Sequence, residues 1–181
     1  DPVAGLELFS CLRDAAPDAW GRRVIHARLA GRGATGPEIG EITYLLESGS
    51  DRVGCLDFQE SATDYRSRDH DAASLDDLQK AAELVHCGAP IPPDLAAALQ
   101  HGTTVGGARP KATITAGDTK YVAKFSLSTD TFDLVRAEYL AMTLAGRVGL
   151  DVAPVGLTEA NGRDVLLVRR FDRERTGTGW T

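Results

Sequence analysis

The stretch KATITAGDTKYVAKF, residues 111–125, sets the fold of the second half of the chain. Residues 111–115 alternate between polar and apolar side chains, which is typical of a strand with one buried face. Gly117-Asp118 forms a tight-turn pair, and the apolar run 121–125 follows it. The pattern predicts two antiparallel strands joined as a β-hairpin.

A helix and a second pair of strands are expected after this hairpin. Apolar residues recur at helical spacing over 133–148, and Gly149 can end that helix. Strands are predicted near 152–157 and 165–168, with the turn pair Asn161-Gly162 between them. The order strand, strand, helix, strand, strand predicts an antiparallel sheet with one packed helix.

The first hundred residues have mostly helical patterns. Helices are predicted in four segments: 6–31 (in two parts, restarting near Pro17), 37–47, the segment that follows the cap residue Ser74, and a short one that opens at Pro93. A short strand is predicted over 53–58. We therefore expect an α+β protein, with a helical region at residues 1–100 and the sheet region at 101–181.

Composition limits the classes of function. The chain has 181 residues and 43% hydrophobic side chains, which is typical of a globular protein. Its net charge of −6 makes direct, sequence-independent binding of nucleic acid unexpected. No apolar run is long enough for a membrane span, and the first ten residues have no secretion signal, so we expect a cytoplasmic protein. The three cysteines form no CxxC pair and are expected to be buried free thiols.

The candidate chemistry lies around the predicted hairpin. The glycine-rich segment 103–111 can bring backbone N–H groups close to an anion, although a plain turn has the same composition. Lys124 lies inside an apolar strand, and Glu138 lies on the core-facing side of the following helix. Because an unpaired buried carboxylate is unfavourable, we expect Lys124 to pair with Glu138. The pair either presents the lysine to a phosphate or is an internal salt bridge with no ligand.

Several short motifs together resemble the HipA family, bacterial serine/threonine kinases of which many are toxins of type II toxin–antitoxin modules. The motifs are VGGARPK at 105–111, YVAKF at 121–125, AEY at 137–139 and LVRRFDR at 167–173. Upstream, DAWGRR at 18–23 and the segments 43–46 and 53–58 resemble the region that precedes the kinase core. The resemblance implies that residues 101–181 form a protein-kinase-like N-lobe up to the hinge, after a partial N-terminal region.

The resemblance also implies a role for individual residues. Val105, Gly106, Gly107, Ala108 and Lys111 would form the phosphate loop, Lys124 would bind the ATP phosphates, and Glu138 would be its partner. Val168, Arg169 and Phe171 would belong to the hinge that holds the adenine. Arg169 departs from relatives with an acidic residue there. Thr104 stands where relatives carry an autophosphorylated serine, although it is also an ordinary turn residue.

The family's catalytic and metal-binding aspartates lie in a C-lobe beyond the hinge, which this chain does not reach. Asp172 is expected to pair with neighbouring arginines rather than to act as a catalytic acid. We therefore interpret the chain as a fragment, inactive alone, with no catalytic or metal-binding residue of its own. The whole protein would use ATP and Mg²⁺ to phosphorylate a serine or threonine.

The resemblance implies two partners for the whole protein. One is a protein substrate, an aminoacyl-tRNA synthetase in well-known members, whose phosphorylation stops translation. The other is a helix-turn-helix antitoxin like HipB. Two alternatives stay open: a non-catalytic pseudokinase or partner-docking module, and a phosphate binder without kinase ancestry.

Overall fold

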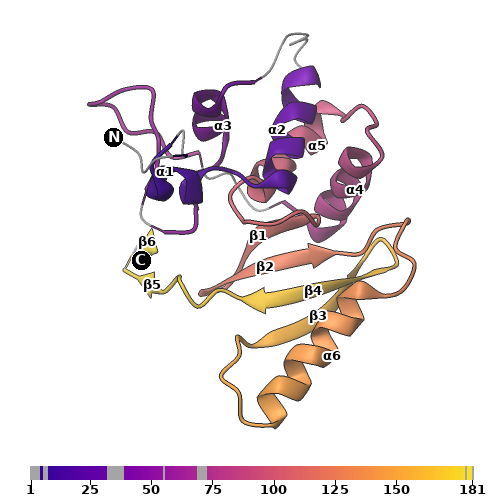
Figure 1. The fold of residues 1–181 in the computed structure, drawn as a ribbon. Helices are drawn as coiled ribbons and strands as arrows, with labels where there is room; N and C mark the ends of the chain where they lie inside the picture. Colours follow the sequence, from indigo (N-terminus) through magenta and orange to yellow (C-terminus); the bar gives the residue numbers. More distant parts are fainter. Residues whose placement is uncertain are drawn as a thin grey trace.

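A four-stranded antiparallel sheet in the order β1-β2-β4-β3 forms the centre of the sheet region (Figure 1). The strands are β1 (Lys111–Ala116), β2 (Thr119–Phe125), β3 (Val155–Ala160) and β4 (Arg163–Arg169). The computed structural model describes residues 5, 8–31, 39–54, 56–68, 73–177 and 179–180. It confirms the α+β fold class, the hairpin over 111–125 and the antiparallel sheet.

The two hairpin turns have the backbone that their sequences predict. Asn161 and Gly162 both have positive φ angles, of 47° and 71°, as a type I′ turn between β3 and β4 requires. Gly117 has a φ of 59° and joins β1 to β2. The register places Lys111 opposite Lys124 and Val122 opposite Val168.

The helices of the first hundred residues gather on one side of the sheet (Figure 1). They are α1 (Ser10–Ala15), α2 (Ala19–Gly31), α3 (Glu41–Glu47), α4 (Leu75–His86), α5 (Pro93–Ala98) and the 3₁₀ helix η1 (Leu99–Gly102). The hydroxyl of Ser74 accepts a hydrogen bond from the N–H of Asp77, so the predicted cap of α4 is confirmed. Helix α6 (Leu134–Arg147) lies on the other side of the sheet.

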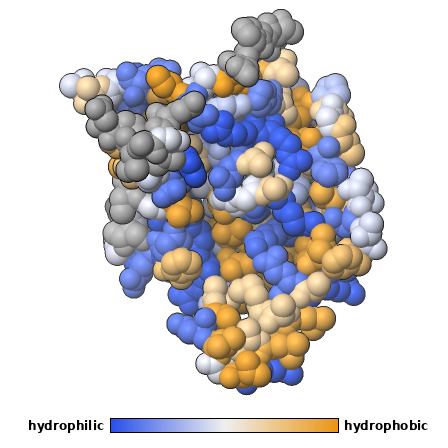
Figure 2. Space-filling view, viewed as in Figure 1, coloured by the Kyte–Doolittle hydropathy of each residue, from blue (hydrophilic) through white to orange (hydrophobic). Residues whose placement is uncertain are grey.

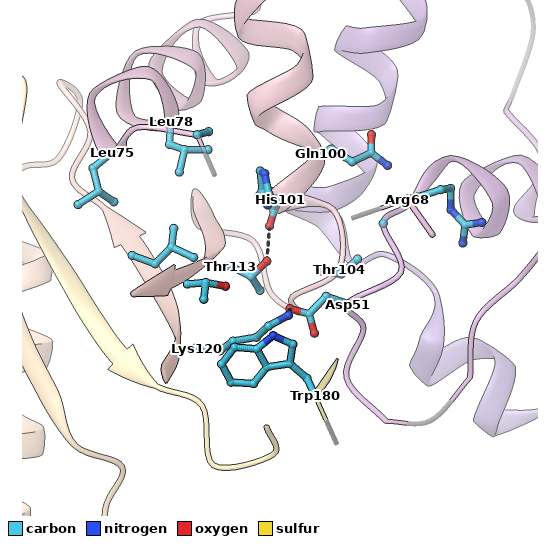
Figure 3. Close-up of a pocket in the computed structure, with 14 residues that line it drawn as sticks. Asp51, Arg68, Leu75, Leu78, Gln100, His101, Thr104, Thr113, Lys120 and Trp180 are labelled. Carbon is cyan, nitrogen blue, oxygen red and sulfur yellow. Dashed lines mark hydrogen bonds and ion pairs between the residues drawn. The ribbon is translucent and has the colours of Figure 1, made fainter. Parts of the chain in front are cut away.

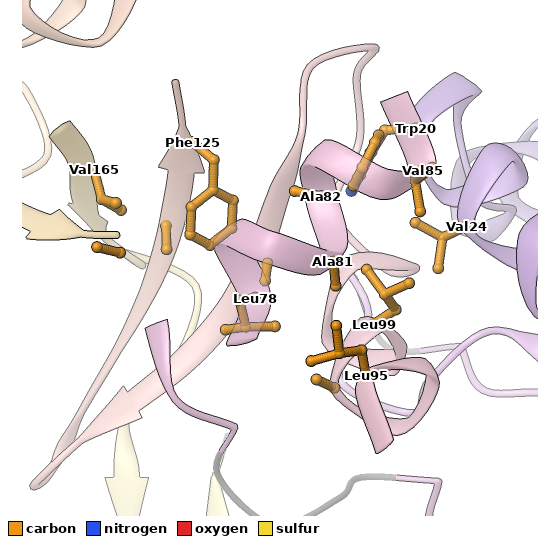
Figure 4. Close-up of a cluster of buried hydrophobic side chains, with 14 residues drawn as sticks. Trp20, Val24, Leu78, Ala81, Ala82, Val85, Leu95, Leu99, Phe125 and Val165 are labelled. Carbon is orange, nitrogen blue, oxygen red and sulfur yellow. The ribbon is translucent and has the colours of Figure 1, made fainter. Parts of the chain in front are cut away.

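The hydrophobic core lies between the sheet and α4 (Figure 4). Phe125 and Val165 project from the sheet and are 1% and 0% exposed. They belong to one cluster with Leu78 of α4 and, deeper in the helical region, Trp20 and Leu99. We call this side of the sheet the α4 face. Its core joins residues from both predicted regions of the chain.

The opposite side, the α6 face, is packed differently. Val135 is the buried residue of α6, whereas Leu140, Leu144 and Val148 are 57%, 58% and 76% exposed. These three residues belong to the apolar repeat from which this helix was predicted, but the side of α6 that faces the sheet carries Val135 and Glu138. Figure 2 shows an apolar surface at the lower end of the molecule, over α6.

Three further expectations need correction. Residues 53–58 form no strand where described, since Gly54 has a φ of 84° and the carboxylate of Asp57 accepts a bond from the N–H of Phe58. Cys11 and Cys87 are exposed free thiols rather than buried ones, and Cys55 lies outside the described residues. The small hairpin of β5 (Arg175–Thr176) and β6 (Gly179–Trp180) was not predicted.

Among the described residues, no helix has both the length and the apolar character that crossing a membrane requires.

Candidate functional site

Two lysines and one glutamate meet on the α6 face. Lys111 of β1 and Lys124 of β2 are register partners, so their side chains leave the sheet on the same face. The ammonium group of Lys124 contacts Oε1 of Glu138 on α6, which confirms the predicted pair. The side chains of this pair are 27% and 37% exposed, so the contact is reachable from solvent. Glu138 thus contacts one of the two lysines directly.

The environment of Lys111 disfavours its charge. Lys111 is 6% exposed, and burial lowers the pKa of its ammonium group, with a further lowering from the charge of Lys124. The carboxylates of Asp18 and Glu138 act in the opposite direction, but the pKa remains below its ordinary value. Like charges directly opposite each other on adjacent strands are destabilising. An anion bound between the two lysines would relieve that repulsion.

The glycine loop folds over this lysine pair. Lys111 Nζ donates to the carbonyl oxygen of Gly106 at 2.6 Å. Gly107 has a φ of 104°, a backbone conformation that favours glycine, and a Cβ added to it would displace the flexible end of Lys111. The N–H of Gly107 donates to Oδ2 of Asp18 at 2.7 Å. A carboxylate therefore occupies the anion-binding amide of the loop.

Helix α2 holds the rest of this loop in place. The N–H of Trp20 donates to the carbonyl of Gly107 at 3.1 Å, and the indole N–H of Trp20 donates to the carbonyl of Lys111 at 2.9 Å. Arg23 donates to the carbonyl of Ala108. The sequence analysis missed these contacts, because no spacing places DAWGRR beside residues 106–108. Its only signal was the occurrence of both segments among the family motifs.

Arg109 anchors the other end of the loop. Its guanidinium donates to both carboxylate oxygens of Asp130, at 3.0 and 2.7 Å. The hydrogen bond from Arg109 lowers the pKa of Asp130, and a bond from the N–H of Leu127 acts in the same direction. The loop is thus fixed by a charged bidentate contact as well as by α2.

The predicted hinge residues lie at the end of β4. Val168 is half-buried in the sheet between Val122 and Val155, on the same face as Lys124. Arg169 and Phe171 line a cavity of about 340 Å³, and Phe171 is 94% exposed. Arg170 is buried and donates to both oxygens of Asp172, at 2.9 and 2.7 Å, so the predicted arginine pairing of Asp172 is confirmed.

A second cluster, missed from the sequence, surrounds Asp51 beside the hinge. Its carboxylate pairs with Lys120 at 2.7 Å, and with Arg170 and Arg173 at 3.0 Å each. Arg170 and Arg173 also donate to the carbonyl of Arg52. These contacts connect the chain beside the predicted hinge residues to the segment after α3. No spacing in the sequence indicates that a residue near position 50 meets residues near 170.

The remaining predicted residues lie apart from the lysines. Thr104 lines a separate cavity of about 460 Å³, and its methyl group lies close to Gly49. Val105 is half-buried, and Ala108 is exposed. Lys124 and Glu138 do not line that cavity. The site that the structure assembles from the predicted residues therefore contains Gly106, Gly107, Lys111, Lys124 and Glu138.

This arrangement is suited to binding a phosphate group. It offers two ammonium groups and a loop amide, all of which can donate to phosphate oxygens. A divalent metal has no comparable set, because the described residues contain no group of three or more His, Cys, Asp or Glu side chains that could hold one.

Two comparisons relate parts of this chain to known proteins. The family model described as "HipA-like C-terminal domain" matches residues 103–179. A Sinorhizobium fredii (strain NBRC 101917 / NGR234) protein named "Putative kinase Y4mE" is 43% identical over 58 residues, which is 32% of this chain. The aligned segment is 12% of that protein's length, so the chain spans only a small part of this relative.

Proposed function

We propose that residues 103–179, which match the family model of the HipA-like C-terminal domain, bind the phosphates of ATP within a serine/threonine kinase. The observation that carries the proposal is the lysine pair. Lys111 and Lys124 face each other on adjacent strands, Glu138 contacts Lys124, and the pKa of Lys111 is lowered. The phosphate tail of a nucleotide would reduce the repulsion between the two lysines.

The roles of the residues follow from their positions. Glu138 holds the Lys124 ammonium in place, and Lys124 and Lys111 donate to phosphate oxygens. The N–H of Gly107 becomes a third donor once Asp18 releases it. A half-buried row of side chains, Val122, Val168 and Val155, lies two residues further along the strands, about 7 Å from Lys124. This row offers an apolar surface toward the predicted hinge. We propose that the adenine lies there, held by the backbone of the predicted hinge at 168–171.

These groups would orient ATP, but they do not complete phosphoryl transfer. Transfer also requires carboxylates for Mg²⁺ and a base for the acceptor hydroxyl. The described residues do not fit a divalent metal, so no step through magnesium is assigned to them. We expect the 181 residues to bind nucleotide without transferring phosphate, with those functions supplied by the family's C-lobe in the complete protein.

The exposed apolar side of α6 supports a larger assembly. Leu140, Leu144 and Val148 recur every four residues, and Leu150 is 63% exposed just beyond them. We propose that the C-lobe of the complete kinase covers this surface. The remaining features of the proposal rest on the family: a HipB-like antitoxin as partner, an aminoacyl-tRNA synthetase as substrate, autophosphorylation at Thr104 and a cytoplasmic location.

Substitution of Lys124 tests the nucleotide site. Lys124→Met should weaken binding of a fluorescent ATP analogue by at least about tenfold, because a charge-assisted bond to phosphate is lost. Lys80→Met is the matched control, since Lys80 is exposed on α4 and should leave binding unchanged. Urea unfolding should show both variants folded. Equal binding by Lys124→Met and the original chain would contradict the proposal.

The alternative, a non-catalytic docking module, is favoured by one observation. The loop amide and Lys111 are already engaged by Asp18 and Gly106 within the chain. A module of this kind would bind no ATP analogue even with Lys124 intact. The same titration therefore separates the two functions.

A further inference from the structure

Strand β1 is an edge strand with unused backbone groups. The N–H of Phe125 donates to the carbonyl of Pro110, which makes this pair a hydrogen-bonded one. Since hydrogen-bonded and non-bonded pairs alternate in antiparallel strands, the even-numbered residues of β1 bond to β2. The N–H and C=O groups of Lys111, Thr113 and Thr115 therefore point away from β2.

The free part of this edge begins at Thr113. The carbonyl of Lys111 accepts the indole N–H of Trp20, and η1 packs beside it. No bond from the part of the chain that the structure describes reaches the backbone N–H or C=O of Thr113 or Thr115. Thr113 and Thr115 therefore each present one free backbone N–H donor and one free backbone C=O acceptor. Such an edge is a template for another strand.

A cavity of about 460 Å³ lies along this edge (Figure 3). Leu75 and Leu78 of α4 line one side, and Arg68 lies at the other. Lys120 and the ring of Trp180 lie at its lower end in the view, with Lys120 Nζ 5.1 Å from the ring centroid. The volume is in the range of ligand sites in proteins.

A charged cluster that reaches the cavity through Asp51, Arg68 and Lys120 favours an anionic occupant. Ion pairs among the described residues join five cations (Arg52, Arg68, Lys120, Arg170 and Arg173) to three carboxylates (Asp51, Asp57 and Asp172). The one carboxylate in the cavity lining, Asp51, already contacts three of these cations. The cluster keeps a surplus of two positive charges.

We propose that this edge binds an extended acidic peptide of a partner protein as a fifth strand of the sheet. Its backbone pairs with Thr113 and Thr115, and its side chains alternate between the two faces. Those on the α4 face meet Leu75, Leu78 and Ile114 and are apolar. Those on the α6 face meet Lys120, the register partner of Thr115, and are acidic. The sheet therefore selects alternating apolar and acidic residues, independently of the nucleotide site.

The test uses the full chain and a fluorescein-labelled peptide, Ser-Val-Glu-Val-Glu-Val-Ser, titrated by fluorescence anisotropy. We expect saturable binding that weakens with added salt and weakens at least severalfold when glutamine replaces both glutamates. Thr115→Pro should weaken binding by about tenfold, because it removes the open N–H without touching the ladder to β2. Thr115→Val keeps that N–H and should bind normally.

A second proline controls for nonspecific effects. The N–H of Arg169 donates to the carbonyl of Pro154, so the odd-numbered residues of β3 face the other free edge. Glu159→Pro removes an equivalent exposed N–H there and should leave peptide binding intact. Absence of saturable binding, equal binding by Thr115→Pro, or equal binding of the glutamine peptide would each overturn the proposal. Binding of a short oligonucleotide in place of the peptide would overturn it as well.

Discussion

The two faces of the sheet differ in how closely their side chains are packed. On the α4 face, Phe125 and Val165 are 1% and 0% exposed and pack into the cluster that reaches Trp20. On the α6 face, Lys124 contacts Glu138 of a helix that buries Val135 and leaves Leu144 exposed. The α4 face supplies hydrophobic stability, whereas the α6 face keeps polar groups reachable. We expect substitutions at the exposed residues of the α6 face to cost less stability than those in the core of the α4 face.

The largest expected effect comes from truncating the core on the α4 face. Phe125→Ala should lower the free energy of unfolding by about 3–5 kcal/mol, since it removes a fully buried ring and leaves a cavity. Leu144→Ala, on the outer side of α6, should change it by less than about 0.5 kcal/mol. Urea unfolding of both variants measures the difference. Similar losses in the two variants would show that the faces do not differ in this way.

The contrast between the faces also explains what the sequence could predict. The hairpin, the capped helices and the Lys124–Glu138 pair depend on local spacing and on residues at most fourteen apart. The apolar repeat that includes Leu140, Leu144 and Val148 predicts a helix, but it does not tell whether these residues meet the sheet or another surface.

Contacts between distant segments were not predictable. Asp18 reaches Gly107 across 89 positions, and Asp51 reaches Arg173 across 122. Each depends on how the helical region packs against the sheet region, which one sequence does not encode in any local pattern. The same is true of the cavity beside β1, since its lining residues come from segments 49–78, 100–104, 113–120 and residue 180.

A smaller effect is expected from the carboxylate that occupies the loop amide. Asp18→Asn removes the negative charge beside Gly107 and Lys111, so a phosphate no longer competes with it. We expect binding of the ATP analogue to strengthen by up to about tenfold, with the free energy of unfolding changed by roughly 1 kcal/mol. Isothermal titration calorimetry measures the affinity. Asp14→Asn, an exposed neighbour before α2, is the control.

Weaker binding by Asp18→Asn would have a different meaning. It would show that Asp18 holds the loop in its binding form rather than competing with phosphate. The lysine pair would then act only when α2 is anchored, and the α6 face would depend on the helical region more than its packing indicates.

The smallest expected effect is on the titration of Lys111, which measures the polarity of the α6 face directly. Burial and the charge of Lys124 lower its pKa, so in the range between that pKa and the ordinary value of 10.5 the unfolded chain binds more protons than the folded one. The contribution of Lys111 to stability therefore rises as pH rises through this range. NMR titration should place its midpoint below the ordinary lysine value of 10.5. Lys124→Met should raise the midpoint only in part, because burial is the larger cause. A full return to 10.5 would mean that repulsion between the lysines, rather than burial under the loop, governs the pKa of Lys111.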